Sequence, residues 1–156
     1  MKILVLGNYF YPEHIGGIEI VTSNLVKYSR DAGHQVRWMA ADVPPRYRNL
    51  MDGDMPIRSW NITEEKFGFP QPIPVPSEII CLYRTVQWCD VVHLHDSLYI
   101  INILVFLISK LLKKPVIITQ HTEVIPYIDK WKNWLQSFAL RTIGVVMHKY
   151  SDYSVF

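Results

Sequence analysis

Short apolar runs alternate along this chain with segments whose apolar residues recur at helical spacing. The first run, Lys2 to Leu6, ends at Gly7 and predicts a fully buried strand. Apolar residues then follow a helical period over 18–28, and Gly33 stands where helices commonly end. The segment 34–41 is a second strand-like run. We therefore predict a right-handed βαβ unit with parallel strands.

The same alternation continues through the rest of the chain. We expect further strands at 57–62, 90–95, 116–119 and from 154 onward, and helices at 78–87, 98–112 and 130–148. Ser77 is the expected N-cap of the first of these helices. This order predicts an α/β fold, a Rossmann-like doubly wound parallel sheet with helices on both faces. In the last helix, the expected core residues are Trp131, Trp134, Leu135, Phe138, Ile143 and Val146.

The segment from Asp42 to Pro76 departs from this regular pattern. Apart from the short strand at 57–62, we expect it to be loop over the surface, where recognition groups often lie. The reason is its proline content, since it holds Pro44, Pro45, Pro56, Pro70, Pro72, Pro74 and Pro76.

Composition narrows the class of protein. The 156 residues suffice for one domain, and 49% hydrophobic with 19% charged residues is typical of a folded globular chain. The formal net charge of +2 argues against a nucleic-acid binder, which would carry a concentrated basic face. The two cysteines, Cys81 and Cys89, indicate a reducing compartment, and the N-terminus lacks the pattern of a signal peptide. We therefore expect a cytoplasmic location.

Two features bear on membranes. The apolar segment 98–112 is shorter than the roughly 20 residues that a spanning helix needs, so we expect a buried helix there. A basic patch beside exposed Trp131 or Trp134 is a subsidiary hypothesis for peripheral contact at the inner face of the membrane, and a solvated helix face is its alternative. The patch would consist of Lys110, Lys113, Lys114, Lys130 and Lys132.

Candidate chemistry lies in three turns, at 8–17, 93–97 and 119–123. All three follow strands, and ligands of such sheets bind at the carboxyl ends of the strands. The first turn ends in Gly16-Gly17 at a helix start, where unpaired N–H groups and the helix dipole favour an anion such as phosphate. A simple tight turn is an equally good interpretation. Because G-x-G-x-x-G is absent, a nicotinamide or flavin dehydrogenase is disfavoured.

The other two turns carry histidines. We expect His93 to be packed or hydrogen-bonded within the sheet, and His95 and Asp96 to meet a ligand at the strand end. A metal site on these three residues is an alternative that lacks a further ligand cluster. His121 could donate a hydrogen bond to a sugar hydroxyl or phosphate oxygen, although a purely structural role stays open.

Carboxylates beside two of these turns are candidates for proton transfer. Glu123, after His121, and Glu13, in the first loop, could each act as a general base. Spacing alone does not choose between them.

Together these motifs resemble the family-four glycosyltransferases of the GT-B fold. The opening Tyr9-Phe10-Tyr11-Pro12-Glu13-His14-Ile15-Gly16-Gly17-Ile18-Glu19, with Gly33-His34-Gln35-Val36 after it, is similar to the start of that family. Asp90-Val91-Val92-His93-Leu94-His95 and Pro115-Val116-Ile117-Ile118-Thr119-Gln120-His121 look like two of its later strands. Ser151-Asp152-Tyr153-Ser154-Val155 is similar to the strand before its interdomain region. The resemblance covers nearly the whole chain.

The resemblance implies an enzyme of two Rossmann-like domains with the active site between them. Residues 1–156 would be the N-terminal, acceptor-side domain, and the chain stops in a strand signal before any nucleotide-sugar-binding half. We therefore expect the fragment alone to be inactive. The full enzyme would move a sugar from a nucleotide diphosphate to a glycan or lipid acceptor, with retention of configuration and without a metal or other cofactor. The aromatic and proline-rich segment 44–76 follows no pattern of this family, and we expect it to shape the choice of acceptor.

The same resemblance assigns roles to individual residues. Gly16 and Gly17 would approach the donor diphosphate, and His121, the candidate catalytic residue, would contact the donor sugar. The further candidates for substrate binding are Glu13, His14, His95, Asp96 and Glu123.

Two other functions stay open. A sugar-nucleotide epimerase of related fold would need no acceptor, so product analysis separates it from a transferase. A non-catalytic carbohydrate- or nucleotide-binding module is the second alternative, because this architecture hosts many functions.

Overall fold

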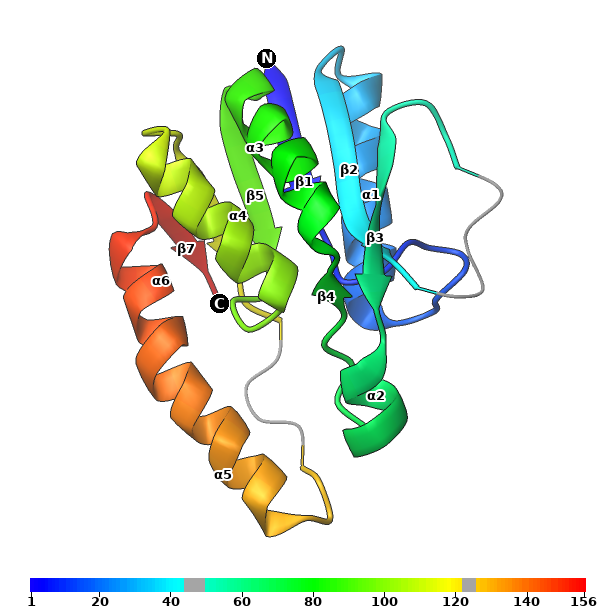
Figure 1. Cartoon of the computed structure of the whole chain (residues 1–156). Coiled ribbons are helices and arrows are strands. Elements are labelled where there is room, and N and C mark those ends of the chain that lie inside the picture. The colour runs from blue at the N-terminus through cyan, green and yellow to red at the C-terminus, as the bar shows by residue number, and fades with distance from the viewer. Residues whose placement is uncertain (44–49, 122–125) are drawn as a thin grey trace.

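The computed structural model describes residues 1–43, 50–121 and 126–156 and shows a single sheet flanked by helices (Figure 1). The strands stand in the order β4-β3-β2-β1-β5-β6-β7, and every neighbouring pair is parallel except β3 and β4. The strand order reverses beside β1, which pairs with β2 on one side and β5 on the other. The strands are β1 (Lys2–Leu6), β2 (Gln35–Asp42), β3 (Asp54–Trp60), β4 (Ile73–Pro74), β5 (Val91–His95), β6 (Val116–Thr119) and β7 (Tyr153–Val155).

Helices cover both faces of the sheet, as the alternating sequence pattern predicts. Helix α1 lies behind the sheet in Figure 1, whereas α3 and α4 lie in front of it. The helices are α1 (Gly17–Asp31), α2 (Ile62–Phe67), α3 (Ile79–Trp88), α4 (Ile100–Leu111), α5 (Lys130–Ala139) and α6 (Val145–Tyr150), with a 3₁₀ turn η1 (Pro76–Glu78) and a π turn η2 (Leu140–Gly144). The prediction of a doubly wound α/β fold is confirmed.

The core forms two layers because side chains alternate along each buried strand. In β1, Val5 packs with Val26 of α1 on one face. Leu4 on the same strand joins the other layer, with Leu82 of α3 and Val105 of α4. Burial on both faces explains why the parallel strands read as continuous apolar runs.

Two local predictions are wrong. The segment 42–76 is not loop throughout, because it contains α2 and β4 besides the expected strand. Ser77 does not cap α3, since η1 precedes the helix and its N-cap is Glu78. The Ser77 hydroxyl instead accepts a hydrogen bond from Arg58 Nη2 at 3.4 Å.

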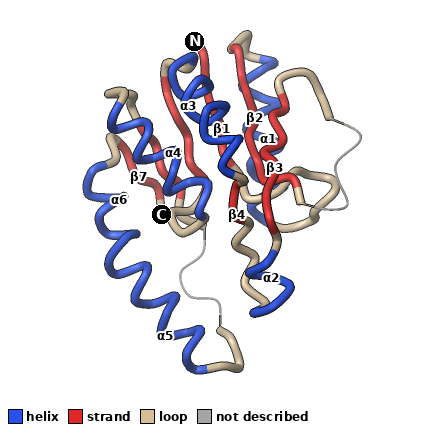
Figure 2. The backbone as a smooth tube through the Cα atoms, viewed as in Figure 1, coloured by secondary structure: helices blue, strands red, loops and turns tan. Residues whose placement is uncertain are grey.

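The predicted core of the last helix is also wrong. Trp131, Trp134, Leu135, Phe138, Ile143 and Val146 are all exposed, Trp134 by 67%. The residues buried there are Gly144 and Met147. The helical segment is broken by η2, and α5 extends past the carboxyl edge of the sheet, so only its α6 end packs on the core (Figures 1 and 2).

The apolar segment 98–112 is predicted from sequence to be a buried helix that does not span a membrane. Among the described residues no helix is long and apolar enough to cross a membrane. Helix α4 is a core helix, with Asn102 and Ser109 fully buried and hydrogen-bonded to backbone carbonyls.

The five lysines do not form one patch. Lys113 follows the end of α4 and Lys130 begins α5, at opposite ends of the molecule (Figure 1). The others have partners: Lys110 pairs with Asp152, Lys114 donates to the Cys89 carbonyl, and Lys132 pairs with Asp129.

Candidate functional site

Three histidines meet where β5 and β6 end. His93 Nε2 lies 2.8 Å from Thr119 Oγ1, so this ring is fixed within the sheet as expected. His95 Nδ1 lies 2.7 Å from His121 Nε2, and the two rings are stacked. Because β5 and β6 are neighbouring parallel strands, the residues at their carboxyl ends come together.

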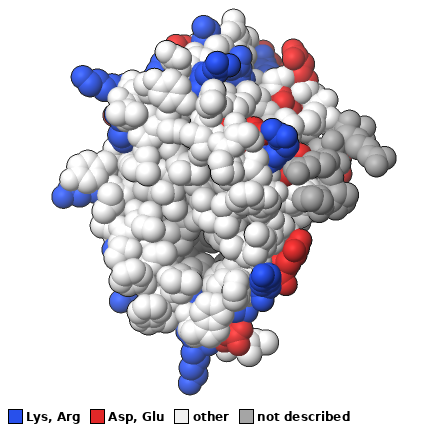
Figure 3. Space-filling view, in the orientation of Figure 1, with Lys and Arg blue, Asp and Glu red and all other residues white. Residues whose placement is uncertain are grey.

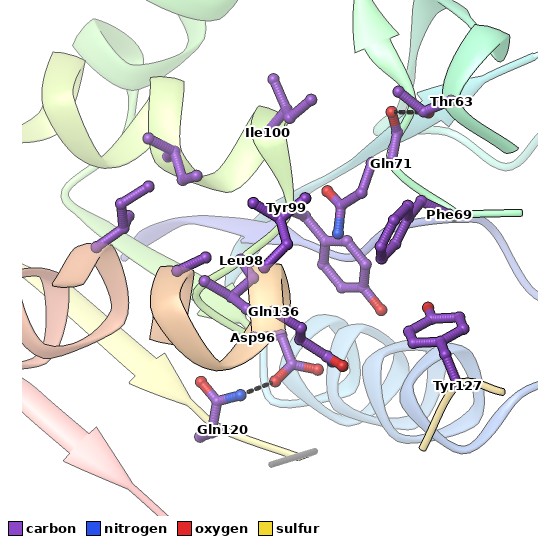
Figure 4. Close-up of a pocket in the computed structure, with 14 residues that line it drawn as sticks. Thr63, Phe69, Gln71, Asp96, Leu98, Tyr99, Ile100, Gln120, Tyr127 and Gln136 are labelled. Carbon is purple, nitrogen blue, oxygen red and sulfur yellow. Dashed lines mark hydrogen bonds between the residues drawn. The ribbon is translucent and has the colours of Figure 1, made fainter. Parts of the chain in front are cut away.

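Asp96 and Gln120 hold this arrangement from the adjoining turns. Asp96 has a positive φ of 67°, which aspartate tolerates better than most residues. Its carboxylate accepts hydrogen bonds from Gln120 Nε2 (Figure 4) and from the backbone N–H of His121, the second at 3.2 Å. Gln120 Oε1 in turn accepts from the Ser97 hydroxyl at 2.9 Å. The backbone that carries His121 is therefore fixed by the β5–α4 turn.

Burial keeps two of the histidines neutral. It lowers the pKa of His93 to about 4, with the charge of His121 adding to the effect. It lowers the pKa of His95 to about 3, with His93 and His121 adding to the effect. In the described part of the chain, His95 Nε2 is buried without a hydrogen-bond partner. An unpaired lone pair is a smaller loss than an unpaired N–H, so we infer that His95 Nδ1 donates to His121 Nε2.

This tautomer defines what His121 offers a ligand. A neutral imidazole that accepts at Nε2 carries its proton on Nδ1. His121 is half-buried, so its ring remains within reach of a ligand. The Nδ1–H of His121 is therefore suited to donate a hydrogen bond to a hydroxyl or phosphate oxygen.

The start of α1 is the second part of the site. Gly16 is the N-cap, and the helix has no side-chain cap, so its first N–H groups are not used by a cap. A Cβ at Gly16 would collide with the Glu19 carboxylate, whereas a Cβ at Gly17 would meet nothing within 4 Å. Glu19 is 8% exposed. Burial raises the pKa of Tyr99, and the charges of Asp96 and Glu19 add to the effect.

Replacing Gly17 with alanine separates folding from ligand binding at this helix start. We expect Gly17→Ala to raise the free energy of unfolding by about 0.5–1 kcal/mol, because alanine favours the helix. It should weaken phosphate binding at this helix start, because the new methyl group fills the space a phosphate would use. Urea denaturation and a phosphate titration measure the two effects. Asn24→Ala, on the exposed side of α1, is the control, and undiminished phosphate binding by Gly17→Ala would exclude this approach.

A cavity of about 340 Å³ adjoins the Asp96–Gln120 pair. It lies between α5 on one side and the segment 63–71 with the start of α4 on the other (Figure 4). Figure 3 shows the hollow between α5 and the region of α2. Its walls are mainly apolar and aromatic, with Phe69, Leu98, Tyr99, Ile103, Tyr127 and Leu135 prominent among them.

Aromatic contacts hold the outer end of this cavity. The rings of Phe69 and Tyr127 are 5.0 Å apart, and Lys132 Nζ lies within 6 Å of both ring centroids. Asn133 fixes the backbone of Tyr127 through two hydrogen bonds, at 2.7 and 2.8 Å. These contacts join the start of α5 to the segment after α2.

The structure brings together some of the predicted residues and separates others. His95, Asp96 and His121 form one cluster. Glu13 and His14 are exposed and do not line the cavity, and the His14 ring stacks on Tyr9 at 4.0 Å. Glu123 lies outside the described residues. No group of three or more His, Cys, Asp or Glu residues within the described ranges could hold a metal ion.

Sequence reasoning missed three contributors. Gln120 stands beside the predicted His121, and its place after a strand was the available signal. Tyr99 and Gln136 line the cavity from helices α4 and α5, and nothing in their spacing distinguishes them from packing residues.

Comparison with known proteins gives a family match. Residues 15–155 match the model of Glycosyltransferase Family 4. A sequence search of curated proteins finds no match.

A solved structure shows the same architecture. The chain is similar to MurG of Acinetobacter baumannii, with a TM-score of 0.52, 14% identity, and coverage of 98% of this chain and 40% of that one. The catalytic domain of starch synthase IV from Arabidopsis thaliana, bound to ADP and acarbose, gives a TM-score of 0.44 and 14% identity, over 78% of this chain and 34% of that one. The chain thus spans less than half the length of either structure.

Proposed function

This chain belongs to glycosyltransferase family 4, and from that membership we propose that it is the N-terminal, acceptor-side domain of a two-domain enzyme. The enzyme transfers a sugar from a nucleotide diphosphate to a glycan or lipid acceptor, with retention of configuration and without a metal or other cofactor. The nucleotide-sugar-binding half lies in a second domain outside residues 1–156. The chain alone is inactive in this proposal, because most of the donor site is missing.

The observation that carries the proposal is the cluster at the carboxyl edge of β5 and β6. His121 is held by His95 on its ring and by Asp96 on its backbone, next to a cavity of ligand size. In our proposal His121 donates a hydrogen bond to the donor sugar, and Gly16 and Gly17 let the diphosphate approach the start of α1. The cavity takes the acceptor. In this proposal His95 and Asp96 position His121, and Glu13, His14 and Glu123 are further substrate contacts.

The test begins with the gene beyond the codon for Phe156. We expect a second Rossmann-like half there, and the full-length protein should transfer sugar from a labelled nucleotide-sugar donor to an added acceptor. Formation of an isomerised donor without any acceptor would support the epimerase instead. Binding without turnover by the full-length protein would support the non-catalytic module.

We also propose a peripheral contact with the inner face of the membrane, through α5 rather than through the lysines named from sequence. Trp131, Trp134 and Phe138 lie on one side of α5 and are each more than half exposed. Such rings insert at the boundary of headgroups and acyl chains. The proposed location is therefore cytoplasmic, at the membrane surface.

Vesicle co-sedimentation tests this contact. The chain should sediment with phosphatidylserine-containing vesicles, and the double variant Trp131→Ala/Trp134→Ala should lose most of that binding. Trp60→Ala, which removes an exposed ring from β3, is the matched control. Equal sedimentation of all three proteins would remove α5 from the contact.

A further inference from the structure

We propose that the cavity beside α5 binds the hydrocarbon chain of a lipid acceptor. This inference rests on the proposed function and narrows it, because it chooses the lipid acceptor over the free glycan. Three observations support it. The cavity walls are mainly apolar, most polar groups beside the cavity already have hydrogen-bond partners, and α5 has one side in the cavity and another exposed to solvent.

The walls suit a hydrocarbon chain. Leu135, Ala139 and Ile143 line one side at steps of four residues, so they form a single stripe along α5 and η2. Leu98 and Ile103, from around the start of α4, face them across the cavity. Moving a chain from water into such surroundings is favourable in proportion to the apolar area it buries.

Most polar groups at the cavity already have protein partners. The Asp96 carboxylate accepts from Gln120 and His121, and Gln120 accepts from Ser97. The Thr63 hydroxyl donates to the backbone carbonyl of Gln71 at 2.6 Å. A bound sugar ring would need partners for several hydroxyls, and leaving them unpaired in a buried site costs free energy.

One buried acceptor remains. Gln71 Oε1 is buried without a hydrogen-bond partner in the described ranges. It can receive one hydroxyl, as the polar end of an amphiphile would offer. A chain in the apolar part of the cavity would place its polar end beside Asp96 and Gln120, the residues that hold the His121 backbone.

The outer side of α5 indicates that the hydrocarbon chain comes from a lipid bilayer. While one stripe of the helix lines the cavity, Trp134 and Phe138 are exposed to solvent. Exposed aromatic rings of this kind insert at the boundary of headgroups and acyl chains. The helix would thus lie between the bilayer and the cavity that receives the lipid chain.

A series of alkyl maltosides, used below their micelle-forming concentrations, tests the inference by isothermal titration calorimetry on this chain. All members share one head group, so only the chain length changes. We expect affinity to rise about two- to fourfold for each added methylene, up to the length that fills the cavity, and maltose alone to show no binding.

Variants locate the binding. Ala139→Phe fills the cavity from α5 and should weaken decyl maltoside binding at least tenfold, and Ala139→Leu should have a smaller effect in the same direction. Ser137→Phe adds the same ring to the same helix outside the cavity and should leave affinity unchanged. Trp134→Ala should also leave it unchanged, because the exposed ring is not part of the cavity. Circular dichroism checks that each variant is folded.

Three outcomes would overturn the inference. Maltose that binds as tightly as decyl maltoside would mark the cavity as a glycan site. Chain-dependent binding that survives Ala139→Phe but is lost in Trp134→Ala would place the chain on the outer surface of α5. The absence of any chain-length dependence would exclude a hydrocarbon subsite. None of these measurements requires transfer, so a failed transfer assay with intact, cavity-dependent chain binding would refute the proposed function separately.

Discussion

Lowering the pH from 7 to 4 is expected to destabilise this chain by about 5 kcal/mol. His93 and His95 are the cause, because burial lowers the pKa of these imidazoles to about 4 and about 3, from an ordinary value near 6.5. Between these pKa values the unfolded chain therefore binds more protons than the folded chain does. Stability is fully present above pH 6.5 and is lost as the pH falls toward the folded pKa values.

Urea denaturation at closely spaced pH values measures this dependence. Each imidazole contributes a slope of up to about 1.4 kcal/mol per pH unit between its unfolded and folded pKa. His93→Gln should flatten the curve by about half while keeping a polar group near Thr119. His34→Gln, at a half-buried position after α1, is the control substitution. A free energy of unfolding that stays constant from pH 7 to pH 4.5 would contradict the buried neutral pair.

The second large effect concerns His121. In the full-length enzyme, His121→Ala should lower transfer about 100-fold, the usual cost of removing one hydrogen-bond donor from a developing charge. The same change removes the partner of His95 Nδ1, which should cost about 1 kcal/mol of stability. Activity and thermal unfolding must therefore be measured on the same protein.

A conservative variant separates the two roles of His121. His121→Gln offers an amide that can replace the contact to His95, so stability should recover while transfer stays low. A recovery of transfer together with stability would make His121 a structural turn residue. Unchanged turnover in His121→Ala would remove the side chain from the mechanism.

The sequence predicts best those strands that have apolar neighbours on both faces of the sheet. In β1 the consecutive residues Leu4, Val5 and Leu6 are all buried, so the apolar run marks the strand without knowledge of its neighbours. The meeting of His95 and His121 also follows from sequence, because both residues end parallel strands at one edge of the sheet. Their hydrogen bond and tautomer depend on side-chain geometry that no spacing encodes.

The failures have an equally physical origin. Trp131, Trp134 and Phe138 follow a helical period, which predicts an apolar stripe but does not say what covers it. The π turn η2 gave no signal in the sequence, yet it divides the helix into a packed and an extended part. The cavity could not be predicted because its walls come from segments about 70 residues apart, one of them in the proline-rich stretch.

The two walls of the cavity are connected to different halves of the sheet, and this affects how the cavity can change in evolution. The segment 63–71 is connected to β3 and β4, whereas α4 and α5 follow β5 and β6, on the other side of the point where strand order reverses. Substitutions in one wall therefore leave the strands that carry the other wall unchanged, and the two walls meet through the contacts of Phe69 with Tyr127 and Trp131. Mutational drift in either wall alters the shape of the cavity while folding is preserved. The shape of the cavity can accordingly change in small steps on a scaffold whose architecture is shared with MurG at 14% identity.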